Sequence, residues 1–308
     1  MTATQFADLD LSPRILLGPG PSMVPARVLR AMATPPVGYM DPEYVQVMGD
    51  VKELLRSTFQ TENAVTLPIS GTGSSGMEAA LCNFIEPGDD VLIAIQGFFG
   101  ERLADMAGRY GANVNRVEKP WGEIFTPEEI DTALAQKSYK LMAIVHGETS
   151  TGCVQTRVDE IAAAAHRHGA LLVLDTVASL GGIPVDVDGW DVDICYSGSQ
   201  KCLSAPPGLA PITVSSRAWE VLAQRESPVA NWYLDLKGIW RYWGDAPAYH
   251  HTGPSNMIFA LREALRIVVE EGLDNCLARH KENAELLWAG LEDLGLPPRV
   301  PVEYGWPR

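Results

Sequence analysis

The chain has 308 residues, of which 46% are hydrophobic and 20% are charged, an ordinary composition for a globular protein. This length suits one large α/β domain and part of a second. The formal net charge is −15 and no basic run stands out, which argues against nucleic acid or an anionic membrane as a partner.

The first predicted elements are an arm and two helices. Residues 1–21 are expected to form an irregular arm that ends in Gly18-Pro19-Gly20-Pro21. Ser22 is the expected cap of a short helix. Asp41-Pro42-Glu43 provides a cap followed by proline, so it predicts the start of a longer helix that runs toward Phe59.

Strands and helices then alternate along the chain. Apolar segments predict strands at 64–69, 91–95, 114–117, 141–146, 171–175 and 193–196. Amphipathic patterns predict helices at 74–85, 101–110, 158–168, 256–271 and 274–294, and Thr126-Pro127-Glu128-Glu129 forms a capping box that opens one more. This alternation predicts a mostly parallel sheet with helices on both faces and ligands at the carboxyl ends of its strands.

The turn Ser70–Gly76, SGTGSSG, follows a predicted strand and opens a helix. It contains G-x-G-x-x-G, but the next strand ends in Gln96-Gly97 and not in the acidic residue that would hold a ribose. Thr72, Gly73 and Ser74 instead predict a site for one phosphate group, since free N–H groups and the helix dipole favour an anion there. A plain glycine-rich turn is the alternative.

Two charged residues follow strands where solvated charges are not expected. Asp175 ends the apolar segment 171–175, where a carboxylate needs a cation such as a protonated ring nitrogen. Among the seven lysines, only Lys201 stands in a turn of small residues just after a strand. Partial burial there lowers the pKa of the amine, and a neutral amine can form a Schiff base.

A phosphate site, a buried aspartate and a Schiff-base lysine together predict pyridoxal 5′-phosphate as the cofactor. Its ring needs partners on both faces. Phe99 follows the strand after the phosphate turn, and Val177 lies two residues past the aspartate, so they are the candidates. Core packing is an equal alternative for Phe99.

These residues belong to motifs that resemble class V aminotransferases of the pyridoxal-phosphate fold type I, and within them the alanine–glyoxylate and serine–pyruvate branch. The likeness extends over nearly the whole chain, up to about residue 300. The motifs are LLGPGPS (16–22), SGTGSSGMEAAL (70–81), HGETSTG (146–152), LDTVASLGG (174–182), YSGSQKCLSAPPG (196–208) and YHHT (249–252).

The resemblance implies a homodimer with shared active sites, acting on small amino acids and 2-oxo acids. Lys201 would form the Schiff base with the cofactor and would also act as general base and general acid in the reaction. Asp175 would be the partner of the ring nitrogen, and Phe99 would stack on the ring. The remaining cofactor residues would be Thr72, Gly73, Ser74 and Gln200 at the phosphate, Thr149 near the ring hydroxyl, Val177 on the ring, and Tyr249 and Thr252 at the neighbouring subunit's phosphate. Gly20, Gly38 and Tyr39 would line the substrate space.

The resemblance also implies a large cofactor-binding domain over 22–272 and the start of a small, C-terminally short domain over 273–308. Relatives carry an arginine in that small domain that binds the substrate carboxylate. Neither Arg299 nor Arg308 stands in its context, so we expect impaired turnover. A cofactor-binding but catalytically silent homologue stays an alternative. A cysteine desulfurase-like lyase is less favoured because Gln200 precedes the lysine, and a nicotinamide oxidoreductase because the acidic residue is missing.

Cysteine spacing and the first residues bear on location. The five cysteines show no CxxC spacing, and the first residues, MTATQFADLD, are acidic and lack an apolar stretch. We therefore expect reduced thiols, no secretion signal, and a cytoplasmic protein, or one of an organelle matrix in a eukaryote. No apolar run reaches the length of a membrane span. His166 and His168 lack a third ligand, so no metal site is expected.

Overall fold

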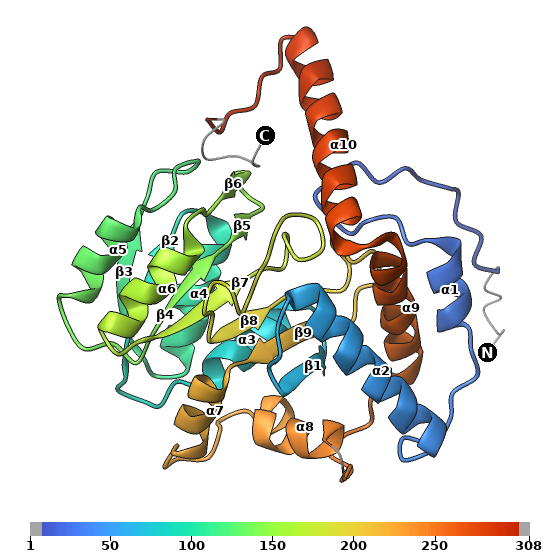
Figure 1. Cartoon of the computed structure of the whole chain (residues 1–308), viewed down its shortest axis with the longest axis horizontal. Coiled ribbons are helices and arrows are strands. Elements are labelled where there is room, and N and C mark those ends of the chain that lie inside the picture. Colours follow the sequence, from blue (N-terminus) through green and yellow to red (C-terminus); the bar gives the residue numbers. More distant parts are fainter. Residues whose placement is uncertain (1–7, 245, 302–308) are drawn as a thin grey trace, which may run out of the picture.

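The computed structural model, shown in Figure 1, describes residues 8–244 and 246–301. Its main sheet has seven strands in the order β1-β9-β8-β7-β4-β2-β3. Only β9 runs antiparallel to its neighbours, β1 and β8, and every other pair is parallel. Figure 1 shows α5 and α6 on one side of the sheet and α3 and α4 on the other. This confirms the predicted fold of mostly parallel strands with helices on both faces.

The strands lie close to the predicted segments. They are β1 (Val65–Ser70), β2 (Asp90–Ile95), β3 (Asn113–Glu118), β4 (Leu141–Val145), β7 (Leu171–Asp175), β8 (Ile194–Tyr196) and β9 (Leu209–Val214), with a separate hairpin of β5 (Gly147–Glu148) and β6 (Cys153–Val154). β9 was not predicted. It is fully buried and carries Pro211, which lies opposite Pro68 of β1. The Pro211 carbonyl accepts from the Ser197 N–H at 2.8 Å, so the polar backbone groups of Pro211 point away from β1.

The described helices follow the predicted pattern with boundaries shifted by a few residues, except Ser216–Ala223 and Leu236–Trp243, which were not predicted. They are α1 (Ala26–Met32), α2 (Pro42–Phe59), α3 (Gly73–Cys82), α4 (Phe98–Arg109), α5 (Pro127–Leu134), α6 (Val158–Arg167), α7 (Ser216–Ala223), α8 (Leu236–Trp243), α9 (Ser255–Glu271) and α10 (Leu273–Asp293). Both predicted starts are present: Asp41 accepts from the Glu43 N–H at α2, and Thr126 and Glu129 form the capping box of α5.

One predicted cap is wrong. α1 begins after Pro25, and Ser22 does not cap it. The Ser22 backbone N–H donates to the Gln200 carbonyl at 2.9 Å, and its hydroxyl donates to the Lys201 carbonyl at 2.8 Å. The reason is tertiary: these carbonyls belong to the turn after β8, against which the arm packs.

The C-terminal part of the structure extends from the body of the molecule. Cys276 is the one buried residue of α10, which projects outward in Figure 1. The division at residue 272 into two domains stays a prediction. Residues 1–7 of the predicted arm and 302–308 of the predicted second domain, Arg308 included, lie outside the described residues. No described helix is both long and apolar enough to span a bilayer.

Candidate active site

The predicted site residues come from loops at one edge of the sheet. β2, β4, β7 and β8 are parallel, and β1 points the same way because β9 is antiparallel to both β1 and β8. Their carboxyl ends therefore share an edge, where a chain running out of a parallel sheet exposes its loops. At this edge Thr72 follows β1, Asp175 is the last residue of β7, and Lys201 follows β8. Phe99 lies at the start of α4 after β2, and Thr149 follows the short strand β5 after β4.

Lys201 is half-buried under the N-terminal arm. Its Nζ donates to the Pro19 carbonyl at 2.8 Å. A Cβ atom on Gly20, whose φ is +146°, would lie 2.6 Å from this Nζ, so the predicted substrate residue Gly20 lies directly against the amine. Burial lowers the pKa of the Lys201 amine, although Cys202 and Asp175 oppose this. The lowered pKa makes the neutral, nucleophilic form of this amine easier to reach than that of an exposed lysine.

Asp175 is buried, with 3% of its surface exposed. One carboxylate oxygen accepts from the Val177 N–H at 2.8 Å, and the other accepts from the Tyr196 hydroxyl at 2.7 Å. Burial raises the pKa of Asp175 to about 6, and these hydrogen bonds oppose the rise. Within the described residues no cation bonds to this carboxylate. Sequence reasoning missed Tyr196, although it is the first letter of the motif around Lys201.

The phosphate turn has the predicted form. Thr72 is the N-cap of α3, and its carbonyl accepts from the N–H groups of Ser75 and Gly76 at 2.7 and 3.3 Å. The N–H groups of Gly73 and Ser74 are the ones left without a partner within the helix. A Cβ atom on Gly73 would lie 3.1 Å from Val177 Cγ2, which brings the turn against the loop after Asp175. Gln200 Oε1 is buried without a hydrogen-bond partner in the described structure, and it would lie 3.0 Å from a Cβ atom on Gly198.

Phe99 lies in the first turn of α4 and is half-buried. The Arg102 guanidinium lies 4.9 Å from the centre of its ring, and Arg102 Nη1 donates to Ser74 Oγ at 3.0 Å. Sequence analysis missed Arg102. A single arginine on a helix is not recognisable as part of a phosphate site from the sequence, because only the fold brings it from α4 to the turn at Ser74.

Glu148 holds the start of α4 from the loop that also contains Thr149. One oxygen accepts from the N–H groups of Phe99 and Gly100 at 3.1 and 3.3 Å, and the other accepts from the N–H and hydroxyl of Ser150 at 3.1 and 2.6 Å. Four donors aimed at two oxygens select a carboxylate, which accepts at both ends. Glu148 therefore fixes the position of Phe99, and the sequence analysis missed it as well.

Other predicted residues form a second group. Tyr249 and Thr252 are exposed and share a hydrogen bond between their hydroxyls at 2.9 Å. Tyr39 and Gly38 lie in the turn before α2, where the Tyr242 hydroxyl donates to the Tyr39 carbonyl at 3.1 Å and the Tyr242 ring contacts that of Tyr249. Within the described part of the chain, no hydrogen bond or ring contact connects these four residues directly to Lys201.

Buried His251 connects the second group to the first. His251 Nε2 bonds to the hydroxyl of Ser70, the last residue of β1, at 2.8 Å, and its ring contacts that of Tyr242. The segment that carries Tyr249 is thereby tied to the strand that leads into the phosphate turn.

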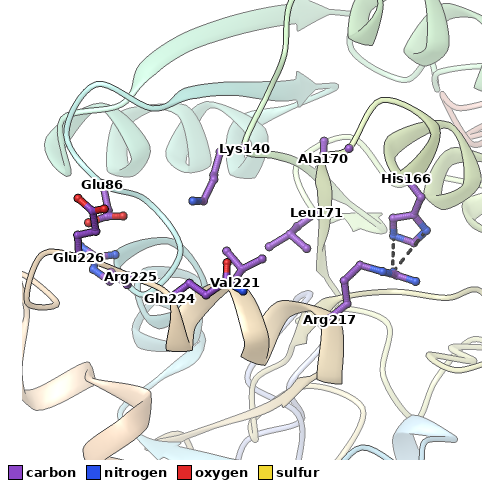
Figure 2. Close-up of a pocket in the computed structure, with 11 residues that line it drawn as sticks. Glu86, Lys140, His166, Ala170, Leu171, Arg217, Val221, Gln224, Arg225 and Glu226 are labelled. Atoms are coloured by element: carbon purple, nitrogen blue, oxygen red, sulfur yellow. Dashed lines mark hydrogen bonds between the residues drawn. The ribbon is translucent and has the colours of Figure 1, made fainter.

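A pocket of about 430 Å³ lies elsewhere, as Figure 2 shows. Lys140 and Ala170, which line it, directly precede β4 and β7, so this pocket is at the amino ends of the strands. Arg217 turns toward His166 and also donates to the Asp193 carboxylate at 2.7 Å. The pocket is separate from the candidate active site. The positive charge of Arg217, which lines it, is already paired with the Asp193 carboxylate.

Comparison with known proteins agrees with this geometry. The sequence model of the family "Aminotransferase class-V" matches residues 15–299. The chain is 42% identical over 301 residues to (S)-ureidoglycine–glyoxylate transaminase of Bacillus subtilis (strain 168), covering 92% of this chain and 72% of that protein. It is 44% identical over 286 residues to alanine–glyoxylate aminotransferase of Drosophila melanogaster, covering 92% and 73%. The crystal structure of alanine–glyoxylate aminotransferase from Nostoc sp. superposes with a TM-score of 0.97 at 50% identity, covering 99% of this chain and 80% of that one. This chain belongs to the class V aminotransferases.

Proposed function

We propose that this pyridoxal-phosphate-dependent aminotransferase moves an amino group from L-alanine or L-serine to glyoxylate or pyruvate. Two relatives at 44% and 43% identity are named for alanine and glyoxylate, and one at 42% for ureidoglycine and glyoxylate. All three names support glyoxylate as the acceptor, and two of them support alanine as the donor. The observation that carries the proposal is the half-buried Lys201 amine at the sheet edge that also holds the buried Asp175. We also propose a cytoplasmic or organelle-matrix location, which the five free cysteines support.

The residues present fit pyridoxal phosphate in charge and in shape. The buried Asp175 carboxylate bonds to a hydroxyl and an N–H but to no described cation, so a protonated ring nitrogen would complete it. The buried, unpartnered end of the Gln200 amide offers a further polar group beside Gly198. Either end of an amide can occupy such a position, so it can present an N–H to a phosphate oxygen.

The other cofactor residues follow from these anchors. Thr72, Gly73 and Ser74 would bind the phosphate through the free N–H groups and hydroxyls of the first turn of α3. Phe99 and Val177 would lie against the two faces of the ring. Thr149 would bind near the ring hydroxyl, since its loop packs beside the start of α4.

Bound pyridoxal phosphate supplies an electron-accepting ring that stabilises negative charge at the carbon bearing the amino group. The protein's part is proton transfer and positioning. Lys201 would hold the cofactor through its amine and, once displaced by the amino donor, would take the proton from the substrate's α-carbon and return it to the cofactor carbon that carried the aldehyde. Ionised Asp175 would keep the proton on the ring nitrogen. Gly20, Gly38 and Tyr39 would shape the substrate space.

We further propose a homodimer in which the partner's Tyr249 and the partner's Thr252 complete each phosphate site. The arm exposes Leu11, Ile15 and Leu17, with 77%, 76% and 91% of their surfaces accessible. Apolar side chains grouped on one segment favour contact with another protein surface. Sedimentation should give twice the mass of one chain, and a monomer at micromolar concentration would contradict this part.

The test of function combines labelling with turnover. The purified chain is loaded with pyridoxal phosphate, reduced with borohydride and digested, and the pyridoxyl group should be found on the Lys201 peptide. The unreduced enzyme should convert L-alanine and glyoxylate to pyruvate and glycine. Lys201→Ala should lose both results, whereas Lys140→Ala, which changes a lysine of the distant pocket, should retain both. A label on another lysine would refute the proposal, and labelling without turnover would identify a silent homologue.

A desulfurase-like reaction is less well supported. It needs a cysteine that can reach the substrate, and four of the five cysteines are buried. The fifth, Cys202, donates its thiol to the Ala178 carbonyl, and burial raises its pKa to about 11. A thiol held in the neutral form is a poor nucleophile.

A further inference from the structure

We propose that Arg102 supplies positive charge to the cofactor's phosphate group, across the gap between α4 and α3. This inference rests on the proposed cofactor site. It adds a residue that no sequence motif of the site contains, and it replaces the expectation that backbone and hydroxyl donors alone hold the phosphate.

The position of Arg102 is set by both helices. Its side chain leaves the first turns of α4, and the guanidinium lies 5.2 Å and 4.9 Å from the ring centres of Phe98 and Phe99. Nη1 then donates to the hydroxyl of Ser74, the second residue of α3, at 3.0 Å. The positive charge therefore stands beside the free N–H groups that would face the phosphate.

Arg102 has donors to spare. A guanidinium has five N–H groups, and within the described residues Arg102 uses one of them in a hydrogen bond, to a neutral hydroxyl. No Asp or Glu of the described chain forms an ion pair with it. By contrast, Arg109 of the same helix pairs with Asp105 at 2.9 Å. The charge of Arg102 does act on the buried Asp175 carboxylate from a longer distance. A half-buried cation with no carboxylate at ion-pair distance suits an anion that the free protein does not supply.

The charge balance of the site points the same way. A phosphate monoester carries nearly two negative charges at neutral pH, and the chain has a formal net charge of −15. The N-terminus of α3 offers about half a positive charge. Lys201 gives its amine to the covalent attachment of the cofactor. Arg102 is then the nearby residue that can add a full charge and a forked pair of donors.

A purely structural role for Arg102 makes a different prediction. If its guanidinium only holds the Phe99 ring in place, its loss weakens binding of the ring, whether or not a phosphate is attached. If it binds the phosphate, its loss weakens pyridoxal phosphate and leaves pyridoxal, which has the same ring and aldehyde but no phosphate, almost unaffected.

The experiment compares these two ligands. Cofactor-free wild-type chain, Arg102→Gln and Arg102→Met are titrated with pyridoxal phosphate and with pyridoxal, and binding is followed by quenching of tryptophan fluorescence. Arg102→Met keeps an apolar stem against the two phenylalanine rings, so it covers the case in which Arg102→Gln does not fold. We expect the Kd for pyridoxal phosphate to rise about 10- to 100-fold in both variants, and the Kd for pyridoxal to change less than about 2-fold. Arg109→Gln, on the same helix, should bind both ligands like wild type.

Salt provides a second readout. The Kd of the wild-type chain for pyridoxal phosphate should rise more steeply with ionic strength than that of either variant, because one charge pair is missing in the variants. Equal losses for the two ligands, or unchanged binding of pyridoxal phosphate, would overturn the inference while the proposed function stands. A wild-type chain that binds neither ligand would overturn both.

Discussion

Tyr196→Phe tests how the protein controls the charge of Asp175. The change removes the hydroxyl that donates to the buried carboxylate at 2.7 Å and leaves the ring in place. The Val177 N–H then remains as the one hydrogen-bond donor to Asp175 among the described residues. With the hydroxyl absent, the ionised form of Asp175 loses one of its two donors, and its pKa should rise further.

The magnitude follows from general values. A hydrogen bond to a charged group contributes about 1.5–3 kcal/mol, and one pKa unit corresponds to about 1.4 kcal/mol. The pKa of Asp175 in the folded chain should therefore move from about 6 to about 7–8 in the variant. A carboxyl group with a raised folded pKa binds its proton more tightly in the folded state, so the folded state loses stability as pH rises between the unfolded and folded pKa values.

This sign gives a window in which the two chains differ. In wild type the loss of stability due to Asp175 runs from about pH 4 to about pH 6, whereas in Tyr196→Phe it continues to about pH 8. Urea unfolding of the cofactor-free chains at pH 5 and pH 8 measures it. We expect the difference in unfolding free energy between wild type and variant to be about 1.5–3 kcal/mol larger at pH 8 than at pH 5.

A matched control separates this effect from loss of a buried hydroxyl. Tyr44 is also fully buried, but its hydroxyl has no hydrogen-bond partner in the described structure. Tyr44→Phe should therefore shift stability equally at both pH values. The extra loss in Tyr196→Phe should also vanish in an Asp175→Asn background. The same difference between wild type and Tyr196→Phe at pH 5 and pH 8 would refute the role assigned to this hydrogen bond.

Three further predictions concern single side chains. Glu148→Gln puts an amide N–H where an oxygen now accepts, so urea titrations should show a loss of about 1–3 kcal/mol, and unchanged stability would contradict the four bonds. Gly73→Ala puts a methyl group 3.1 Å from Val177 Cγ2, so the Kd for pyridoxal phosphate should rise, while Gly49→Ala, which meets open space, should not change it. Burial lowers the pKa of His251 from 6.5 to about 4, so it adds stability above pH 6.5 that is lost as pH falls through 4. His251→Asn should flatten that part of the stability profile, and an unchanged slope would refute the assignment.

The sequence predicted the elements that local pattern determines. β7 matches its predicted range residue for residue, because an uninterrupted apolar run ends at a charged residue. The capping box at Thr126 set the start of α5 for a similar reason. β9 was missed, and its proline is not the reason, because β1 also carries one, Pro68, and was predicted. β9 is defined by its pairing with β1 and β8, which the local pattern does not show.

The candidate site divides in the same way. Thr72, Asp175 and Lys201 are recognisable from the sequence, because each is a polar or charged residue at or just after the end of a predicted strand, and its type indicates its chemical role. Tyr196 and Arg102 are not recognisable, because their partners are distant in the sequence. Tyr196 contacts Asp175, 21 positions away, and Arg102 contacts Ser74, 28 positions away. A tyrosine in a strand and an arginine on a helix look like core and surface until the fold brings them to their partners.

This division says where specificity for the cofactor's charges is held. In the proposed site the motif residues would contact each part of pyridoxal phosphate, and several of those contacts would come from neutral hydroxyls and N–H groups. Tyr196 acts on the ionisation of Asp175, and Glu148 fixes the helix start from which Phe99 and Arg102 reach the ring and the phosphate turn. A variant that keeps every motif but loses Tyr196, Glu148 or Arg102 should therefore fold and yet bind the cofactor weakly. Its cofactor-binding segments would be present, but the charged and hydrogen-bonding groups that position them would be missing.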